Sequence, residues 1–135
     1  MKILVTGGLG FIGSHTVVEL LNENYEVVVI DNLYNSNIGV IDKIKKITGK
    51  DFLFYENDVC DKEALRKIFK ENEIDAIIHF AGYKAVGESV EKPLMYYDNN
   101  LESTIALLEV ANEFNVKKIA FHHLQLYMVN QNLYQ

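Results

Sequence analysis

Short apolar runs alternate with segments of helical period along most of this chain. The apolar runs predict five strands, at residues 2–6, 26–30, 51–55, 76–80 and 117–121. The intervening segments have a period near 3.6 and predict helices at residues 11–22, 40–48, 62–72 and 93–115. Such alternation is typical of an α/β fold, in which right-handed crossovers join the strands of a doubly wound parallel sheet.

The apolar positions of the later helices predict which side each one buries. The predicted inward positions are Leu65, Ile68 and Phe69 in the third helix, and Ile105, Leu108 and Ala111 in the fourth. Glu109 and Glu113 are expected to turn outward. Pro93, the only proline, falls in the first turn of the fourth helix, where its missing N–H costs no hydrogen bond.

A glycine-rich turn separates the first strand from the first helix, with glycines at positions 7, 8, 10 and 13. Gly7 and Gly8 let the chain leave the strand through angles that a Cβ would resist, Gly10 permits close approach of a phosphate, and Gly13 lets the helix lie tightly on the sheet. The helix then begins at Phe11 and Ile12, whose N–H groups would face a pyrophosphate. Because an acid follows at the end of the next strand, this context favours a dinucleotide site over a ligand-free turn. We predict a Rossmann-type sheet, incomplete at about five strands.

The loop after the second strand carries the residues expected at the adenosine. A carboxylate at Asp31 would accept hydrogen bonds from the ribose hydroxyls and repel a 2′-phosphate, which favours NAD over NADP. The alternative is a solvated turn aspartate. Asn32, Asn35 and Ser36 continue the loop as short polar groups.

Candidates also follow the third strand. Asp58 would hold the adenine amino group while Val59 packs on the ring, or Asp58 would instead cap the next helix; both readings stay open.

Small residues close the fourth strand, and the helix after it contains an asparagine. Phe80, Ala81 and Gly82 leave space for the cofactor backbone, and Lys84 places a cation beside the phosphates or the nicotinamide ribose, unless it is a plain surface lysine. Asn99 is a poor helix former, either facing the cofactor or exposed as a tolerated amide.

Composition limits the partners. The chain has 135 residues, enough for one domain with its own core, and its net charge of −6 argues against nucleic acid or an anionic membrane surface. The lone Cys60 indicates a reducing, cytoplasmic setting and is expected to be a buried small hydrophobe. His15 and His79 lack metal-ligand spacing, so no metal site is predicted and both are expected to be structural.

Several segments resemble the UDP-glucose 4-epimerase family of extended short-chain dehydrogenases. The similar segments are residues 6–15, 31–33, 79–89, 91–94 and 96–100, and the resemblance runs from Met1 to about Phe121. It implies an NAD-dependent isomerase of galactose metabolism that inverts C4 of UDP-glucose and UDP-galactose, and a family that is commonly dimeric. It also implies that Lys84, Ala85 and Val86 lie near the nicotinamide and the UDP-sugar, and that Asn99 contacts the cofactor.

The catalytic residues that the resemblance implies are missing. The family's Ser-Ser-Ser-Ala-Thr-Val-Tyr-Gly motif should begin after Phe121, and a Tyr-x-x-x-Lys pair should follow, but neither occurs. A one-base shift of suitable synonymous codons restores the serine motif, and Met128 with Val129 forces its glycine. We interpret residues 1–121 as the N-terminal part of an NAD-binding domain and residues 122–135 as an out-of-frame tail, with a naturally divergent tail as the alternative. We expect this fragment to be inactive; a non-catalytic NAD-binding module is the competing reading.

Overall fold

The described part of the chain folds as the alternation predicts. The computed structural model describes residues 1–34, 36–80 and 93–121, with the backbone alone for residues 93–100. The elements in chain order are β1 (Lys2–Thr6), α1 (Phe11–Asn22), β2 (Glu26–Asp31), α2 (Val40–Thr48), β3 (Leu53–Glu56), α3 (Lys62–Glu71), β4 (Ala76–His79), α5 (Pro93–Glu113) and β5 (Lys118–Phe121). The expected bounds of β1, α1 and α2 are confirmed, and each of the other elements differs by one or two residues at one end or at both.

The strands form one parallel sheet in the order β3-β2-β1-β4-β5. From β1 the chain moves outward to β2 and β3, then returns to the other side of β1 for β4 and β5. The direction of winding therefore reverses between β1 and β4, and the predicted doubly wound, Rossmann-type fold is confirmed.

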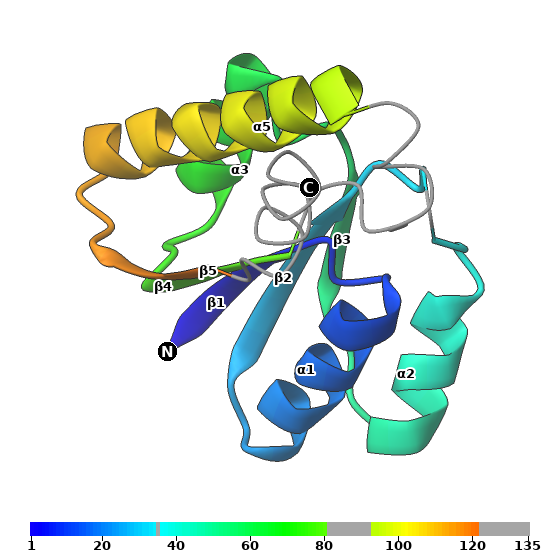
Figure 1. The fold of residues 1–135 in the computed structure, drawn as a ribbon. Coiled ribbons are helices and arrows are strands. Elements are labelled where there is room, and N and C mark those ends of the chain that lie inside the picture. The colour runs from blue at the N-terminus through cyan, green and yellow to red at the C-terminus, as the bar shows by residue number, and fades with distance from the viewer. Residues whose placement is uncertain (35, 81–92, 122–135) are drawn as a thin grey trace.

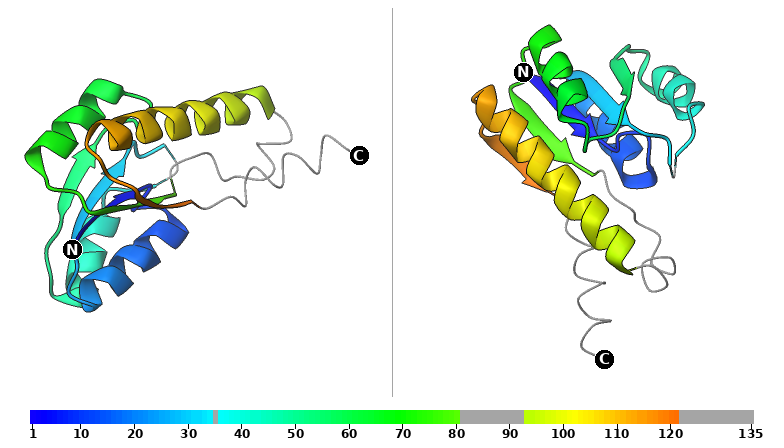
Figure 2. Two further views of the ribbon diagram at one scale, coloured as in Figure 1. Left: turned by 90° about the vertical axis from the view of Figure 1, so that its left-hand side faces the viewer. Right: turned by 90° about the horizontal axis from the view of Figure 1, so that it is seen from above.

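Helices cover both faces of the sheet, with α1 and α2 on one side and α3 and α5 on the other (Figures 1 and 2). Successive residues of β1 feed opposite layers: Leu4 packs with the α3–α5 core, whereas Ile3 and Val5 pack with the α1–α2 core. Strands buried on both faces read as continuous apolar runs, which explains the pattern of the sequence.

The buried side of α5 differs from the expected one. Ala111 is buried as predicted, but Ile105 and Leu108 are 51% and 41% exposed. The residues that do face the core are Ser103, Ala106, Leu107, Val110 and Ala111. The prediction failed because α5 carries apolar residues on more than one side, so the period alone does not decide which side meets the sheet.

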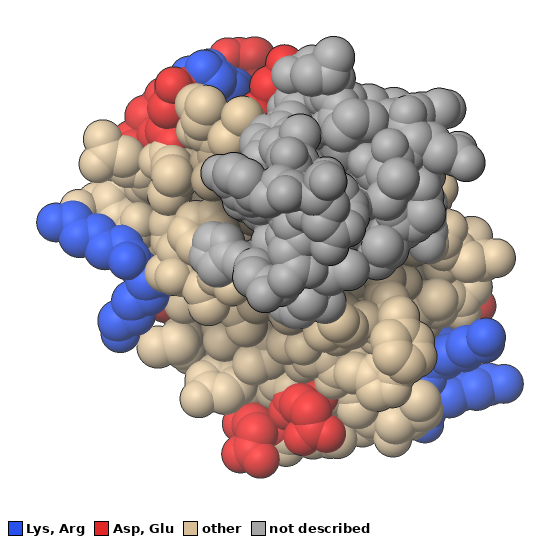
Figure 3. Space-filling model, in the orientation of Figure 1, with Lys and Arg blue, Asp and Glu red and all other residues tan. Residues whose placement is uncertain are grey.

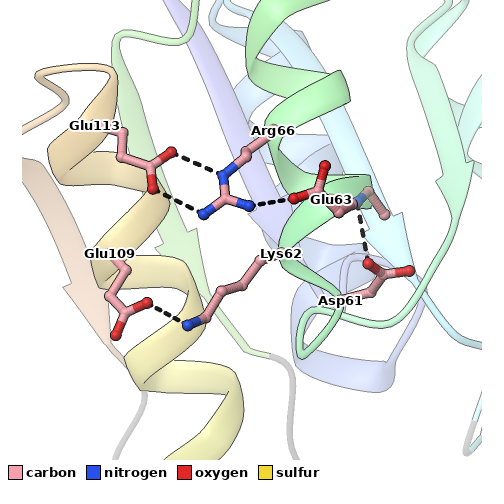
Figure 4. Close-up of polar contacts among 7 residues, drawn as sticks. Asp61, Lys62, Glu63, Arg66, Glu109 and Glu113 are labelled. Atoms are coloured by element: carbon pink, nitrogen blue, oxygen red, sulfur yellow. Dashed lines mark hydrogen bonds and ion pairs between the residues drawn. The ribbon is translucent and has the colours of Figure 1, made fainter.

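Charged residues join α5 to α3 across their exposed sides (Figure 4). Arg66 donates from Nε and Nη2 to the two carboxylate oxygens of Glu113, each at 2.9 Å, and also pairs with Glu63. One turn away, Lys62 pairs with Glu109. Hydrogen bonding from Arg66 lowers the pKa of the Glu113 carboxyl. The two glutamates thus turn outward as expected and meet partners on α3.

The sheet ends at β5 in the part of the chain that the structure describes. None of the helices among the described residues is long and apolar enough for a membrane span.

Candidate functional site

The candidate site lies at the carboxyl edge of the sheet, where the winding reverses. Thr6 ends β1, Asp31 ends β2 and His79 ends β4, and the first two lead directly into loops that carry predicted site residues. In open parallel sheets this edge is where ligands bind.

Three of the four glycines in the turn are required by the fold itself. A Cβ on Gly8 would lie 2.7 Å from Cγ1 of Val29, and a Cβ on Gly13 would lie 2.2 Å from the carbonyl oxygen of Gly7. Gly7 has a φ of 68°, in the left-handed region that glycine adopts without strain. The turn is therefore packed against β2 and α1 as the sequence predicted.

Gly10 is different, because nothing in the fold forbids a side chain there. Its φ of −72° is ordinary, and a Cβ would meet only the Gly7 oxygen at 3.4 Å. Gly10 is the N-cap of α1 and contributes no side-chain cap, and the N–H groups of Phe11, Ile12 and Gly13 have no acceptor within the described residues. Open space beside unpaired N–H groups at a helix N-terminus fits the diphosphate of a dinucleotide.

Asp31 is buried, 7% exposed, so the alternative of a solvated turn aspartate is wrong. Its Oδ2 accepts a hydrogen bond from the Leu9 N–H at 3.1 Å, which ties the glycine turn to β2. Its Oδ1 accepts from the Leu33 N–H and from the Ser36 hydroxyl, both at 2.8 Å. The Asn32 side chain accepts from the Tyr34 N–H at 3.0 Å. The loop is thus organised around one carboxylate.

A groove of about 790 Å³ extends from this turn between α1 and α2. Gly10, Phe11 and Ser36 line its end at the turn, and His15 and Lys43 lie among its other lining residues. The His15 ring nitrogen Nδ1 bonds the Phe11 carbonyl at 2.8 Å, in keeping with the structural role expected for this histidine. The groove opens directly beside the proposed phosphate position.

Asp58 was expected either to hold the adenine amino group or to cap the next helix, and the structure decides the second of these. Asp58 accepts from the Cys60 N–H at 2.9 Å, whereas the helix α3 is capped by Asp61, which accepts from the Ala64 N–H at 3.2 Å. Asp58 as the helix cap is therefore wrong. Val59 is 4% exposed and packs in the α3–α5 core.

Cys60 is half-buried rather than fully buried. Burial and the neighbouring Asp58 raise the pKa of its thiol to about 12, which keeps it protonated and suits the role of a small hydrophobe.

The second half of the predicted site falls largely outside the described residues. Phe80 is buried beyond the end of β4. Asn35, Ala81, Gly82, Lys84, Ala85 and Val86 lie outside the described residues, and Asn99 is described only as backbone within α5.

The face of the molecule drawn in Figure 3 carries charged side chains of both signs. No three His, Cys, Asp or Glu side chains group together among residues 1–34, 36–80 and 93–121. In Figure 3 the charged side chains lie toward the rim, and uncharged ones fill the described surface between them.

One buried polar contact in the site was not anticipated from the sequence. The Thr6 hydroxyl lies 2.6 Å from Nδ1 of His79, and the two residues are far apart in the chain. Only the pairing register, which places Thr6 beside His79, could have revealed it.

Comparison with known proteins identifies relatives over most of the chain. The family model described as GDP-mannose 4,6 dehydratase matches residues 4–125. UDP-glucose 4-epimerase of Bacillus subtilis (strain 168) is 60% identical over 121 residues, 90% of this chain and 36% of that protein. The counterpart of Neisseria meningitidis serogroup C is 56% identical over 120 residues, 89% of this chain and 35% of that protein.

Solved structures agree with the sequence comparison. UDP-glucose 4-epimerase from Bifidobacterium longum in complex with NAD⁺ and UDP matches with a TM-score of 0.87 and 53% identity, over 90% of this chain and 36% of that one. The Thermus thermophilus enzyme in complex with NAD matches with a TM-score of 0.78 and 37% identity, over 88% and 36%. The chain spans about a third of the length of these relatives. It belongs to the family that the GDP-mannose 4,6 dehydratase model describes, and the relatives that it resembles are UDP-glucose 4-epimerases.

Proposed function

We propose that this chain binds NAD at the carboxyl edge of its sheet. The observation that carries the proposal is the open space at Gly10 beside the unpaired N–H groups of Phe11 and Ile12. These groups would hold the diphosphate, and Asp31 with Ser36 would receive the adenosine ribose. The relatives crystallised with NAD support the choice of cofactor.

The substitution Gly10→Ala tests this proposal without disturbing the fold. A Cβ at this position fits the protein but would intrude on a bound phosphate, so NAD affinity should fall by about tenfold or more while the melting temperature stays unchanged. Gly39→Ala is the matched control: it makes the same change at the N-cap of α2, with only the Asn37 side chain at 3.2 Å. Equal NAD affinity in wild type and Gly10→Ala would contradict the proposal.

We propose that a polypeptide of the relatives' full length, with this chain as its N-terminal part, epimerises UDP-glucose and UDP-galactose at C4. Bound NAD supplies the hydride acceptor for that reaction. In this chain, Lys84, Ala85 and Val86 are proposed to lie at the UDP-sugar, and Asn99 at the cofactor. The likeness to UDP-glucose 4-epimerases supports this proposal.

The 135-residue chain itself is proposed to be inactive. The reaction needs a base to take the sugar hydroxyl proton, and no Tyr-x-x-x-Lys pair follows β5 in the sequence. This observation favours the second candidate function, a non-catalytic NAD-binding remnant. Turnover of UDP-galactose by the purified chain would contradict it.

Residues 122–135 are proposed to be an out-of-frame tail. The match to the Bacillus subtilis relative covers 121 of the 135 residues, and the family model ends at residue 125, so part of the C-terminal segment lies outside both matches. Sequencing the DNA across the Phe121 codon tests the proposal. Codons for the serine motif in the adjacent frame are expected, and their absence would contradict the frameshift.

Dimerisation is proposed for the longer polypeptide. Leu101, Ile105 and Leu108 form an exposed apolar stripe on α5, and such a stripe is costly to leave in water. A cytoplasmic setting, a role in galactose metabolism and the absence of nucleic-acid or membrane partners remain proposals that rest on the lone cysteine, the resemblance and the acidic charge. Sedimentation analysis of a frame-restored chain tests the dimer; a monomer at micromolar concentration would contradict it.

A further inference from the structure

Three side chains form a row across the carboxyl ends of the central and edge strands. The register pairs Thr6 with His79 across β1 and β4, and pairs His79 with Phe121 across β4 and β5. The Thr6 hydroxyl lies 2.6 Å from Nδ1 of His79. The His79 ring meets the Phe121 ring edge-on, with centroids 5.7 Å apart and an interplanar angle of 84°. His79 therefore contacts the ends of both neighbouring strands.

The centre of this row is closed to water. Thr6 is fully buried and His79 is 5% exposed. The Thr6 hydroxyl also accepts a hydrogen bond from the Phe80 N–H at 3.0 Å, and the same N–H donates to the Thr6 carbonyl at 2.9 Å. A buried polar contact of this kind favours one arrangement, because any shift would leave polar atoms unsatisfied.

The row lies on the opposite side of the winding reversal from Asp31. Asp31 ends β2, on the side where the adenosine half of a dinucleotide binds, so the nicotinamide half falls over the ends of β4 and β5. Thr6 leads into the glycine turn, and Phe80 ends the described chain after β4. The contact thus joins the two strand ends between which the dinucleotide would cross.

We propose that His79, acting with Thr6, is a positioning residue that sets the end of β4 for the nicotinamide half of bound NAD. The inference rests on the proposed binding of NAD. Backbone pairing already joins β1 to β4, so the side-chain contact is not needed to keep the strands together. Its effect is on the orientation of the strand end, which the nicotinamide ring meets and the adenosine does not.

The ratio of two affinities separates positioning from general stability. ADP-ribose lacks only the nicotinamide ring of NAD. A substitution that disturbs only the contacts of the nicotinamide should therefore lower the affinity for NAD and leave the affinity for ADP-ribose unchanged. We expect His79→Leu and Thr6→Val to lower the affinity for NAD by about tenfold and the affinity for ADP-ribose by less than about twofold. His79→Asn keeps an acceptor near the position of Nδ1 and Thr6→Ser keeps the hydroxyl, so both should restore most of the affinity.

Thr6→Val has nearly the volume of threonine but lacks the hydroxyl, so the melting temperature of each variant is measured first, and Thr6→Ser and His79→Asn keep the test available if an apolar variant fails to fold. Equal losses for the two ligands, or no loss in either, would overturn the positioning role. Absence of NAD binding by the wild-type chain would overturn the proposed function and this inference with it. The two failures are distinct. Failure of the positioning role appears in the ratio of the NAD and ADP-ribose affinities of the variants, whereas failure of the proposed function appears already in the wild-type chain.

Discussion

The two halves of the sheet differ in how much of the site each one contains. In the half formed by β1, β2 and β3, the glycine turn, Asp31 and Ser36 are described and joined by hydrogen bonds within the chain. In the half formed by β4 and β5, most predicted site residues fall outside the described part, and β5 is the last strand of the described sheet. The two buried cores do not divide in this way, because each covers one face of the sheet and includes residues from β1, β2 and β4.

This difference separates folding from function. The first half is organised by contacts between neighbouring segments, which the chain itself supplies. The second half includes the row of contacts that joins the ends of β1, β4 and β5, whose residues lie far apart in the chain. In the proposed site, the first half would hold the adenosine and diphosphate of NAD, and the second half would face its nicotinamide.

The largest expected effect comes from Gly13→Ala, which breaks the first half. The added Cβ would lie 2.2 Å from a backbone oxygen that cannot move without distorting the turn. We expect a loss of about 3 kcal/mol or more in the free energy of unfolding. Urea unfolding measures it, with Gly10→Ala as the matched variant that should remain stable. Equal stability of the two variants would show that the turn is not packed as described.

A smaller effect is expected for Asp31→Ser, which tests whether the first half of the sheet determines the preference for NAD over NADP. Removing the carboxylate removes the repulsion of a 2′-phosphate and the tie to the Leu9 N–H. NAD affinity should fall by about tenfold and the preference for NAD over NADP should largely disappear. Calorimetric titration with both nucleotides measures this, and Asp42→Ala on α2 controls for the loss of one charge. A retained preference would argue against the ribose role of Asp31.

Breaking the α3–α5 ion pairs should have a modest effect on the second half. Arg66→Gln removes both bonds to Glu113, and because these groups are exposed we expect the melting temperature to fall by only about 2 °C. Lys67→Gln removes an ion pair in which Nζ and the Glu71 carboxylate are 3.9 Å apart, so it should lower the melting temperature less. The same loss at high salt as at low salt would exclude an ionic cause.

The same pair predicts a pH dependence of stability. Hydrogen bonding from Arg66 lowers the folded-state pKa of Glu113 below its unfolded value of about 4.3. The stabilisation is therefore complete above the unfolded pKa and disappears as pH falls through the folded pKa. Wild type and Arg66→Gln should converge in strongly acidic solution. A difference that persists there would contradict the assignment.

The smallest effect concerns Cys60, in the loop between β3 and α3. Its thiol pKa of about 12 predicts that iodoacetamide modifies the folded chain at least about tenfold more slowly than the urea-unfolded chain at pH 8. The rate of the folded chain should still be rising at pH 9. Similar rates in both states would show that the thiol is not shielded.

The fold and the first half of the site could be predicted because their signals are local. The turn, the end of β2 and the strand–helix alternation lie within short segments, so period and glycine position suffice. The exposed Ile105 and Leu108 could not be placed, because packing against α3 decides which side of α5 is buried. The bond from the Leu9 N–H to Asp31 and the Thr6–His79 contact were also missed, since their partners are 22 and 73 residues apart and no local pattern relates them.

Backbone amide resonances during an NAD titration test the central claim most directly. If the first half is the prepared part of a dinucleotide site, the N–H signals of Gly10, Phe11 and Ile12 should shift together as NAD is added, with Leu9 moving through its bond to Asp31. Shifts that leave this turn unchanged, or map to the opposite edge around Lys2, Lys50 and Phe52, would contradict the account.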